Sequence, residues 1–171
     1  MKFKPFHIRE GDVFCTSFSG TVIAKAINAV QKFWAKDFSS EYSHSGIFVS
    51  KCGQTFEALW TYKSQDFFKA YEGSKVIVAR PLISMKAKYA IRNLMDEYQG
   101  KLYPLWRLPM HTFPPLSRIH LMDRPVCSEL TALYLHRIGV RDYPPYGTNP
   151  DTLADEWRKW RDYQIIFEGV L

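Results

Sequence analysis

The segment 125–139 constrains the fold most, because it predicts an amphipathic helix with a cysteine in its first turn. Pro125 favours an extended approach to this helix, and Gly139 stands where a helix C-terminus favours left-handed backbone geometry. Apolar side chains recur at helical spacing along it, at Leu130, Leu133, Tyr134 and Ile138. Cys127 therefore lies where unpaired N–H groups and the positive end of the helix dipole favour a thiolate, the nucleophilic form of the side chain.

The composition indicates one globular domain spanning 1–171, since 46% of the residues are apolar and this length suits a single core. The three cysteines, Cys15, Cys52 and Cys127, are odd in number and widely spaced, which fits a reducing compartment better than a disulfide framework or a zinc ribbon. The first residues do not form a signal peptide and no stretch reaches the length of a membrane span. We therefore expect a cytoplasmic protein, or one that is phage-encoded or delivered by lysis.

The net charge of +6 comes from scattered lysines and arginines rather than from a dense basic run. A solvated basic face explains this pattern more simply than a binding surface does, and we expect no nucleic-acid partner. Peripheral contact with an acidic cell wall or an anionic membrane remains open.

Local patterns alternate between strands and helices along most of the chain, which predicts the α+β class. Strands are predicted at about 11–16, 42–50, 55–60, 75–80 and 163–167, and helices at about 19–34, 64–71, 84–98, 127–138 and 150–159. The segment 101–126 is different, because prolines and aromatic residues interrupt every regular pattern in it. We expect this segment to be an insertion that covers a cleft.

A nucleophilic thiol needs a base, and His44 is the best placed of the five histidines. It begins a strand that should be central in the sheet, and Glu57 lies in the partner strand of the hairpin. In the simplest register, His44 lies near Trp60 and Glu57 near Phe48. Contact between His44 and Glu57 would then need a bulge or a reach across a neighbouring strand, so the hairpin argument alone does not complete a triad.

Several short motifs occur in an order that resembles the circularly permuted NlpC-type papain-like cysteine hydrolases, the YiiX-like branch. The motifs are Gly11-Asp-Val-Phe followed by a helix, Tyr42-Ser-His-Ser-Gly-Ile, Phe56-Glu-Ala, Gly100-Lys-Leu-Tyr, Val126-Cys-Ser-Glu-Leu and Asn149-Pro-Asp-Thr-Leu. The resemblance implies a papain-like fold with a central antiparallel sheet packed by helices, in which the histidine strand precedes the cysteine helix. It makes Cys127 the nucleophile, His44 the base and Glu57 the residue that orients His44. Ser45 and Pro104 depart from the family pattern.

Other residues are expected around this catalytic set. Backbone N–H groups of Cys127 and Ser128 should stabilise an oxyanion, and Tyr42 should line the cleft or aid that site, with core packing as its alternative role. Substrate-binding residues are expected in the segment 101–126, namely Tyr103, Trp106 and Arg124.

The expected activity is that of a thiol hydrolase that cleaves amide bonds in a cell-wall peptide or a related isopeptide through a thioester, with a small peptide or acyl compound as substrate. Two alternatives stay open: a lipid acyl hydrolase or acyltransferase with the same site, and a non-catalytic module that keeps the cleft. No cofactor is expected. His111, His120 and Cys127 match no zinc-binding spacing, so no metal site is predicted either.

Overall fold

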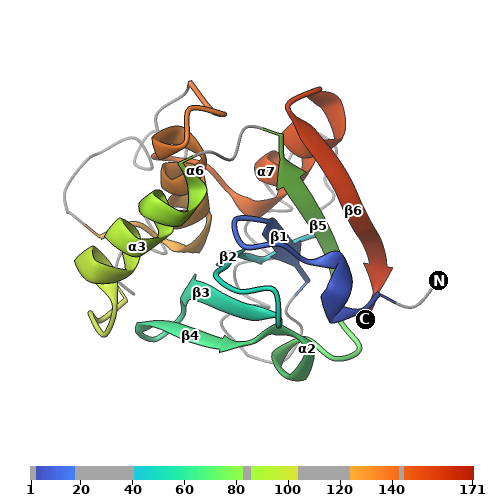
Figure 1. Ribbon diagram of the computed structural model, residues 1–171, viewed down its shortest axis with the longest axis horizontal. Helices are drawn as coiled ribbons and strands as arrows, with labels where there is room; N and C mark the ends of the chain where they lie inside the picture. Colours follow the sequence, from blue (N-terminus) through green and yellow to red (C-terminus); the bar gives the residue numbers. More distant parts are fainter. Residues whose placement is uncertain (1–2, 18–40, 83–85, 104–123, 143–144) are drawn as a thin grey trace.

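A computed structural model describes residues 3–17, 41–82, 86–103, 124–142 and 145–171 (Figure 1). Its centre is a six-stranded antiparallel sheet with the strand order β4-β3-β2-β1-β5-β6. The strands are β1 (Val13–Thr16), β2 (His44–Phe48), β3 (Gln54–Ala58), β4 (Tyr62–Asp66), β5 (Lys75–Pro81) and β6 (Tyr163–Val170). The helices of the described residues are the 3₁₀ turn η1 (Pro5–His7) and the α-helices α2 (Phe67–Ala70), α3 (Ala87–Tyr98), α6 (Cys127–Arg137) and α7 (Pro150–Lys159). The predicted α+β class is confirmed.

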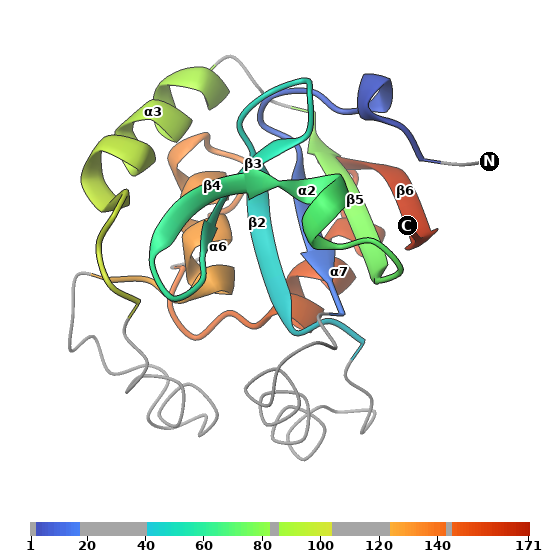
Figure 2. The same ribbon diagram turned by 90° about the horizontal axis from the view of Figure 1, so that it is seen from below.

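The two faces of the sheet carry separate hydrophobic clusters, because successive strand residues point to opposite sides. Val13 and Cys15 of β1 pack with the apolar residues of α3, α6 and α7. Phe14 packs on the other face, with Phe67 of α2 and Ile8 near the N-terminus. Figure 2 shows α2 on the opposite side of the sheet from α6 and α7. The two central strands, β1 and β2, are therefore buried on both faces.

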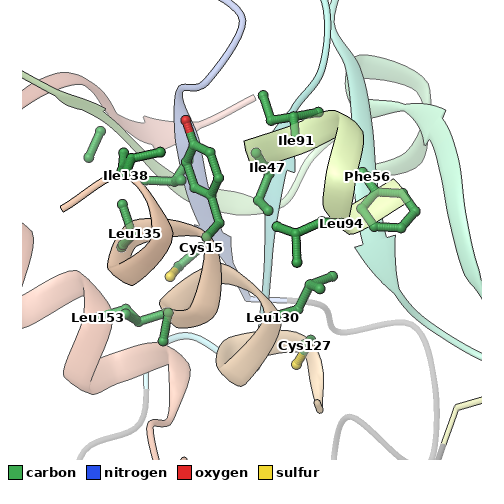
Figure 3. Close-up of a cluster of buried hydrophobic side chains, with 14 of the residues drawn as sticks. Cys15, Ile47, Phe56, Ile91, Leu94, Cys127, Leu130, Leu135, Ile138 and Leu153 are labelled. Carbon is green, nitrogen blue, oxygen red and sulfur yellow. The ribbon is translucent and has the colours of Figure 1, made fainter. Parts of the chain in front are cut away.

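Helix α6 follows the sequence prediction closely. It begins at Cys127 and ends before Gly139, whose φ of 78° lies in the left-handed region that favours glycine. Leu130 and Ile138 are buried against α3 and the sheet, and Figure 3 shows Cys127 at the start of the α6 ribbon, at the edge of this cluster. Helix α7 also starts as predicted at Pro150, and the side chain of Asn149 caps it by accepting a hydrogen bond from the Thr152 N–H.

The prediction of a helix over 64–71 is wrong in its first half. Residues 62–66 form strand β4, because they pair with β3 along its whole length. The helix begins only at Phe67, and its cap is Asp66, which accepts a hydrogen bond from the Lys69 N–H. Tertiary pairing has overridden a plausible local capping signal.

Two further boundaries differ from the prediction, and two expected features lie outside the described residues. Helix α3 begins at Ala87 with Lys86 at its N-cap, and the predicted cap Ser84 is not among the described residues. Strand β6 runs on to Val170 because its pairing with β5 continues to Lys75. The helix predicted at 19–34 and most of the segment 101–126 also lie outside the described residues. Within the described ranges, no helix combines the length and apolarity needed to cross a membrane.

Candidate active site

His44 is the first residue of β2, which lies between β1 and β3 as predicted for a central strand. Its side chain is buried, with the ring close to Phe14 and Tyr71 at centroid distances of 6.3 Å and 6.0 Å. Its Nε2 atom lies 2.6 Å from Oε2 of Glu57. The structure therefore brings together the two residues that the simplest hairpin register kept apart.

The reason is the register of the β2–β3 hairpin, which differs from the expectation. Phe48 pairs with Thr55 and Ile47 with Phe56, so the same register places Glu57 opposite Gly46. His44 and Gly46 point to one face of the sheet, since side chains alternate along a strand. Glu57 thus lies diagonally across from His44, a separation that a long side chain can span without a bulge.

Gly46 provides the space for this diagonal contact. A Cβ atom at this position would lie 2.6 Å from Cγ of Glu57 and 2.8 Å from Cε1 of Phe14. Both distances are far below van der Waals contact, and both neighbours are buried. Glycine at position 46 is therefore a steric requirement of the Glu57 side chain.

Glu57 has no solvent exposure, so its charge depends on the groups around it. Besides His44, the Oε2 atom accepts hydrogen bonds from the Tyr71 hydroxyl and from Nε2 of Gln65, the latter at 3.1 Å. The hydroxyl of Thr55 donates to Oε1. These donors hold the carboxylate against the imidazole ring.

Cys127 occupies the first position of α6, with Val126 as the N-cap. The first intrahelical backbone hydrogen bond runs from the Leu130 N–H to the Val126 carbonyl at 2.8 Å, so the backbone N–H groups of Cys127 and Ser128 precede the hydrogen-bond ladder of the helix. The thiol is only 8% exposed. This arrangement is the helix N-terminus predicted from the sequence.

Two hydrogen bonds fix the backbone immediately before Cys127. The Tyr62 hydroxyl donates to the Pro125 carbonyl at 2.5 Å, and the Val126 N–H donates to Oε2 of Glu129 at 3.0 Å. The second bond belongs to a capping arrangement at the start of α6. The approach to the helix is thus held by β4 on one side and by the helix itself on the other.

The side chain of Cys127 lies close enough to His44 to raise the pKa of the imidazole through hydrogen bonding and charge, and this proximity connects α6 to β2. Because Nε2 of the ring is engaged by Glu57, the nitrogen left for Cys127 is Nδ1. Burial lowers the pKa of His44, but the hydrogen bonds and charges of Cys127 and Glu57 outweigh it and raise that pKa to about 10. The imidazole is therefore protonated at neutral pH, between two groups that can each carry a negative charge.

A second contact ties the same two elements together on the opposite face of β2. The hydroxyls of Ser45 and Thr131 lie 3.0 Å apart, and Thr131 donates to the Cys127 carbonyl at 3.3 Å. Both side chains have no solvent exposure. Ser45 thus links the histidine strand to the cysteine helix.

Tyr103 lies at the candidate site. Its phenol oxygen accepts a hydrogen bond from the backbone of Cys127, and burial together with the charge of Cys127 raises the pKa of the phenol well above its usual value. Arg124 donates to the Leu102 carbonyl at 3.2 Å, which holds its guanidinium beside the same short segment. Trp106, the third residue predicted to bind substrate, lies outside the described residues.

The side chains of Ser128 and Tyr42 both hydrogen-bond to residues outside the set of Cys127, His44 and Glu57. The Ser128 hydroxyl donates to the Thr148 carbonyl at 2.6 Å, so only its backbone N–H is available for an oxyanion. The Tyr42 hydroxyl donates to Glu168 at 3.3 Å, and the cation of Arg158 lies 5.7 Å from its ring. These contacts direct Tyr42 toward α7 and β6, which fits its alternative role in packing.

Sequence reasoning missed the polar residues that surround Glu57. Thr55 could have been found from strand alternation, because it lies two residues before Glu57 and must share its face. Gln65 and Tyr71 gave no such signal, since β4 was predicted as helix and Tyr71 reaches Glu57 only through the turn that follows α2. Tyr62 lies between the predicted strand 55–60 and the predicted helix 64–71, so it gave no signal either.

Neither a protein-family model nor a curated protein sequence matches this chain. Within the described ranges, no group of three or more histidine, cysteine, aspartate and glutamate side chains could hold a metal ion. The case for a function therefore rests on the geometry around Cys127, His44 and Glu57.

Proposed function

We propose that this chain is a thiol hydrolase that cleaves amide bonds with Cys127 as nucleophile, His44 as base and Glu57 as the orienting residue. One observation carries the proposal: a single imidazole lies between a thiol at a helix N-terminus and a buried carboxylate. Nucleophile, base and orienting group in this sequence of contacts form the constellation that activates a cysteine.

In the first half of the reaction, His44 already holds the proton of Cys127 at neutral pH, and the thiolate attacks the carbonyl carbon of the substrate. The negative charge that develops on the carbonyl oxygen is stabilised by the backbone N–H of Ser128, and by that of Cys127 once the substrate oxygen replaces the Tyr103 phenol oxygen as its acceptor. The C–N bond then breaks, and His44 gives its proton to the departing amine. A thioester between Cys127 and the acyl group remains.

In the second half, His44 accepts a proton from water as the water oxygen attacks the thioester carbonyl. The C–S bond breaks, the carboxylic acid leaves, and the thiolate of Cys127 is again paired with the protonated imidazole of His44. Glu57 takes no proton in this scheme. It holds the ring in one orientation and stabilises the imidazolium, as its short contact with Nε2 supports.

We also propose that the chain has the circularly permuted, papain-like architecture. Two features support it: the base lies on an early central strand and the nucleophile on a later helix, and the helix N-terminus meets the end of that strand. A helix that presents a cysteine to an antiparallel sheet carrying a histidine is the arrangement that the sequence resemblance implies.

A cell-wall peptide or related isopeptide is the proposed substrate class, because such peptides carry carboxylates that suit a chain of net charge +6. A second candidate activity, that of a lipid acyl hydrolase or acyltransferase, is favoured by a different observation. Trp60 and Leu102 are 63% and 67% exposed, and both lie beside Tyr103: the Tyr103 N–H donates to the Trp60 carbonyl, and Leu102 precedes Tyr103 and forms a backbone bridge with Thr61. Such side chains could contact an acyl chain.

Digestion of purified wall peptides and of phospholipid vesicles, followed by mass spectrometry of the products, separates these candidates. The wild-type chain should release peptide fragments with a new carboxylate, and Cys127→Ala should release none while keeping its thermal unfolding transition. Cys52→Ala, at an exposed position, serves as the matched control and should keep full turnover. Turnover by Cys127→Ala at the parental rate would refute the assignment of the nucleophile.

A further inference from the structure

The hydroxyl of Tyr71 donates to the same carboxylate oxygen of Glu57 that contacts His44. Tyr71 is the C-cap residue of α2 and lies on the face of the sheet opposite α6. Its ring packs against Phe14 and Phe67, with both centroids at 5.5 Å. This packing accounts for an aromatic ring at position 71, but it gives no reason for the hydroxyl.

We propose that Tyr71 is a positioning residue: through Glu57, it sets the pH range over which the His44 ring is protonated. The inference rests on the proposed role of His44 as the base for Cys127. The hydroxyl and Gln65 together leave Oε2 of Glu57 little freedom to rotate away from the ring, because Gln65 bonds both groups at 3.1 Å and 3.0 Å. Tyr71 and Gln65 are thus bonded to each other and both donate to the same atom, Oε2 of Glu57.

Tyr71 is a donor at every working pH. Burial and the charge of Glu57 raise the pKa of its phenol well above the usual value, so the proton stays on the hydroxyl. The titratable groups that act on His44 are Cys127 from α6 and Glu57 from β3, and Tyr71 acts on Glu57 from the end of α2. Gln65 and Thr55 add neutral donors from β4 and β3.

The direction in which the His44 midpoint moves depends on which protonation state of His44 the Tyr71 hydroxyl stabilises more. When His44 is neutral, Glu57 is a buried charge without a cation beside it, and the donated proton of Tyr71 is worth most. When His44 is protonated, the imidazolium already compensates that charge. Loss of the hydroxyl therefore destabilises the neutral state of His44 more than the protonated state, and His44 keeps its proton to higher pH.

The test is the titration of His44 by NMR in the full-length chain labelled at histidine, with the signal assigned by its loss in His44→Asn. Tyr71→Phe keeps the packed ring and removes the hydroxyl, and it should move the midpoint of His44 upward by on the order of one pH unit. Tyr134→Phe is the matched control. It also removes a buried hydroxyl, one that donates to the Gly11 carbonyl at 3.0 Å, and it should leave the midpoint unchanged.

Gln65→Met provides a second variant in case Tyr71→Phe fails to fold. Gln65 is partly exposed, so this change is easier to accommodate, and it should move the midpoint in the same direction by a smaller amount. An unchanged or lowered midpoint in a folded Tyr71→Phe, or in Gln65→Met if the first variant does not fold, overturns the inference.

Failure of the proposed function gives a different result. If wild-type His44 titrates near the ordinary value of about 6.5 and Cys127 is no more reactive than Cys52, the catalytic pair itself is refuted. If the wild-type midpoint is raised and Cys127 is reactive, but neither variant moves that midpoint, only the role of Tyr71 is refuted.

Discussion

Gly46 lies directly beneath the Glu57 side chain, and a Cβ atom there would come within 2.6 Å of Cγ of Glu57. The backbone of Gly46 is part of strand β2, so the absence of a side chain, rather than an unusual backbone angle, is what this position requires. The short motif from His44 to Gly46 thus contains both the proposed base and the space through which its carboxylate partner reaches it.

Gly46→Ala should therefore disturb the contact between Glu57 and His44. The new methyl group must displace Glu57 or Phe14, both buried, and we expect a loss of about 1–3 kcal/mol of stability. Displacement of Glu57 from His44 should lower turnover by roughly a hundredfold, because the base loses its orientation. Urea unfolding and a hydrolysis assay measure the two effects.

Gly100→Ala is the control for this prediction. A Cβ atom at Gly100 meets nothing within 4 Å, but the φ of 79° makes the substitution strained. It should cost stability, on the order of 1 kcal/mol, and leave turnover unchanged. Full turnover in Gly46→Ala would show that Glu57 does not need this space.

The raised pKa of His44 predicts a specific pH dependence of stability. A histidine whose folded pKa is raised from about 6.5 to about 10 stabilises the fold fully below pH 6.5, and this contribution is lost as the pH rises through 10. The free energy of unfolding of the wild type should exceed that of His44→Asn by roughly 1.5–3 kcal/mol at pH 6. The difference should shrink by pH 10.5.

Urea unfolding of both proteins at the two pH values checks this expectation. Other groups that titrate at alkaline pH, such as the buried thiol of Cys15, act on both proteins and cancel in the difference. A difference that grows between pH 6 and pH 10.5 would mean that His44 is neutral in the folded protein.

Ser45 and Thr131 should stabilise the chain as a coupled pair, since their hydroxyls lie 3.0 Å apart without solvent exposure. Ser45→Ala, Thr131→Val and the double variant form a cycle in which we expect a coupling energy of about 0.5–1.5 kcal/mol. Thr131→Val should be the more damaging single change, because it also removes the bond to the Cys127 carbonyl. Strictly additive losses in urea unfolding would show that the two hydroxyls act independently.

The sequence was informative where local rules decide the outcome. The start of α6 at Cys127 follows from the helical spacing after Pro125, and its end follows from the need for glycine at position 139. The start of α7 follows equally from Pro150. These elements were predicted because their boundaries depend on residues next to them in the chain.

The contact between His44 and Glu57 could not be predicted in the same way. It depends on a hairpin register two residues away from the simplest one, and one hairpin turn does not determine this register. The donors Gln65 and Tyr71 were beyond reach for a related reason, since β4 is a strand only because β3 lies beside it. Residues that meet through tertiary pairing leave little trace in local patterns.

The most direct test of the central claim is the rate at which each cysteine reacts with iodoacetamide at pH 7, followed by mass spectrometry of the full-length chain. Exposure alone favours Cys52, which is exposed, over Cys127, which is 8% exposed. A thiolate paired with the His44 imidazolium should reverse this order, with Cys127 reacting at least about tenfold faster and losing that advantage in His44→Asn. Alkylation of Cys52 ahead of Cys127 in the wild type would contradict the proposal that Cys127 is an activated nucleophile.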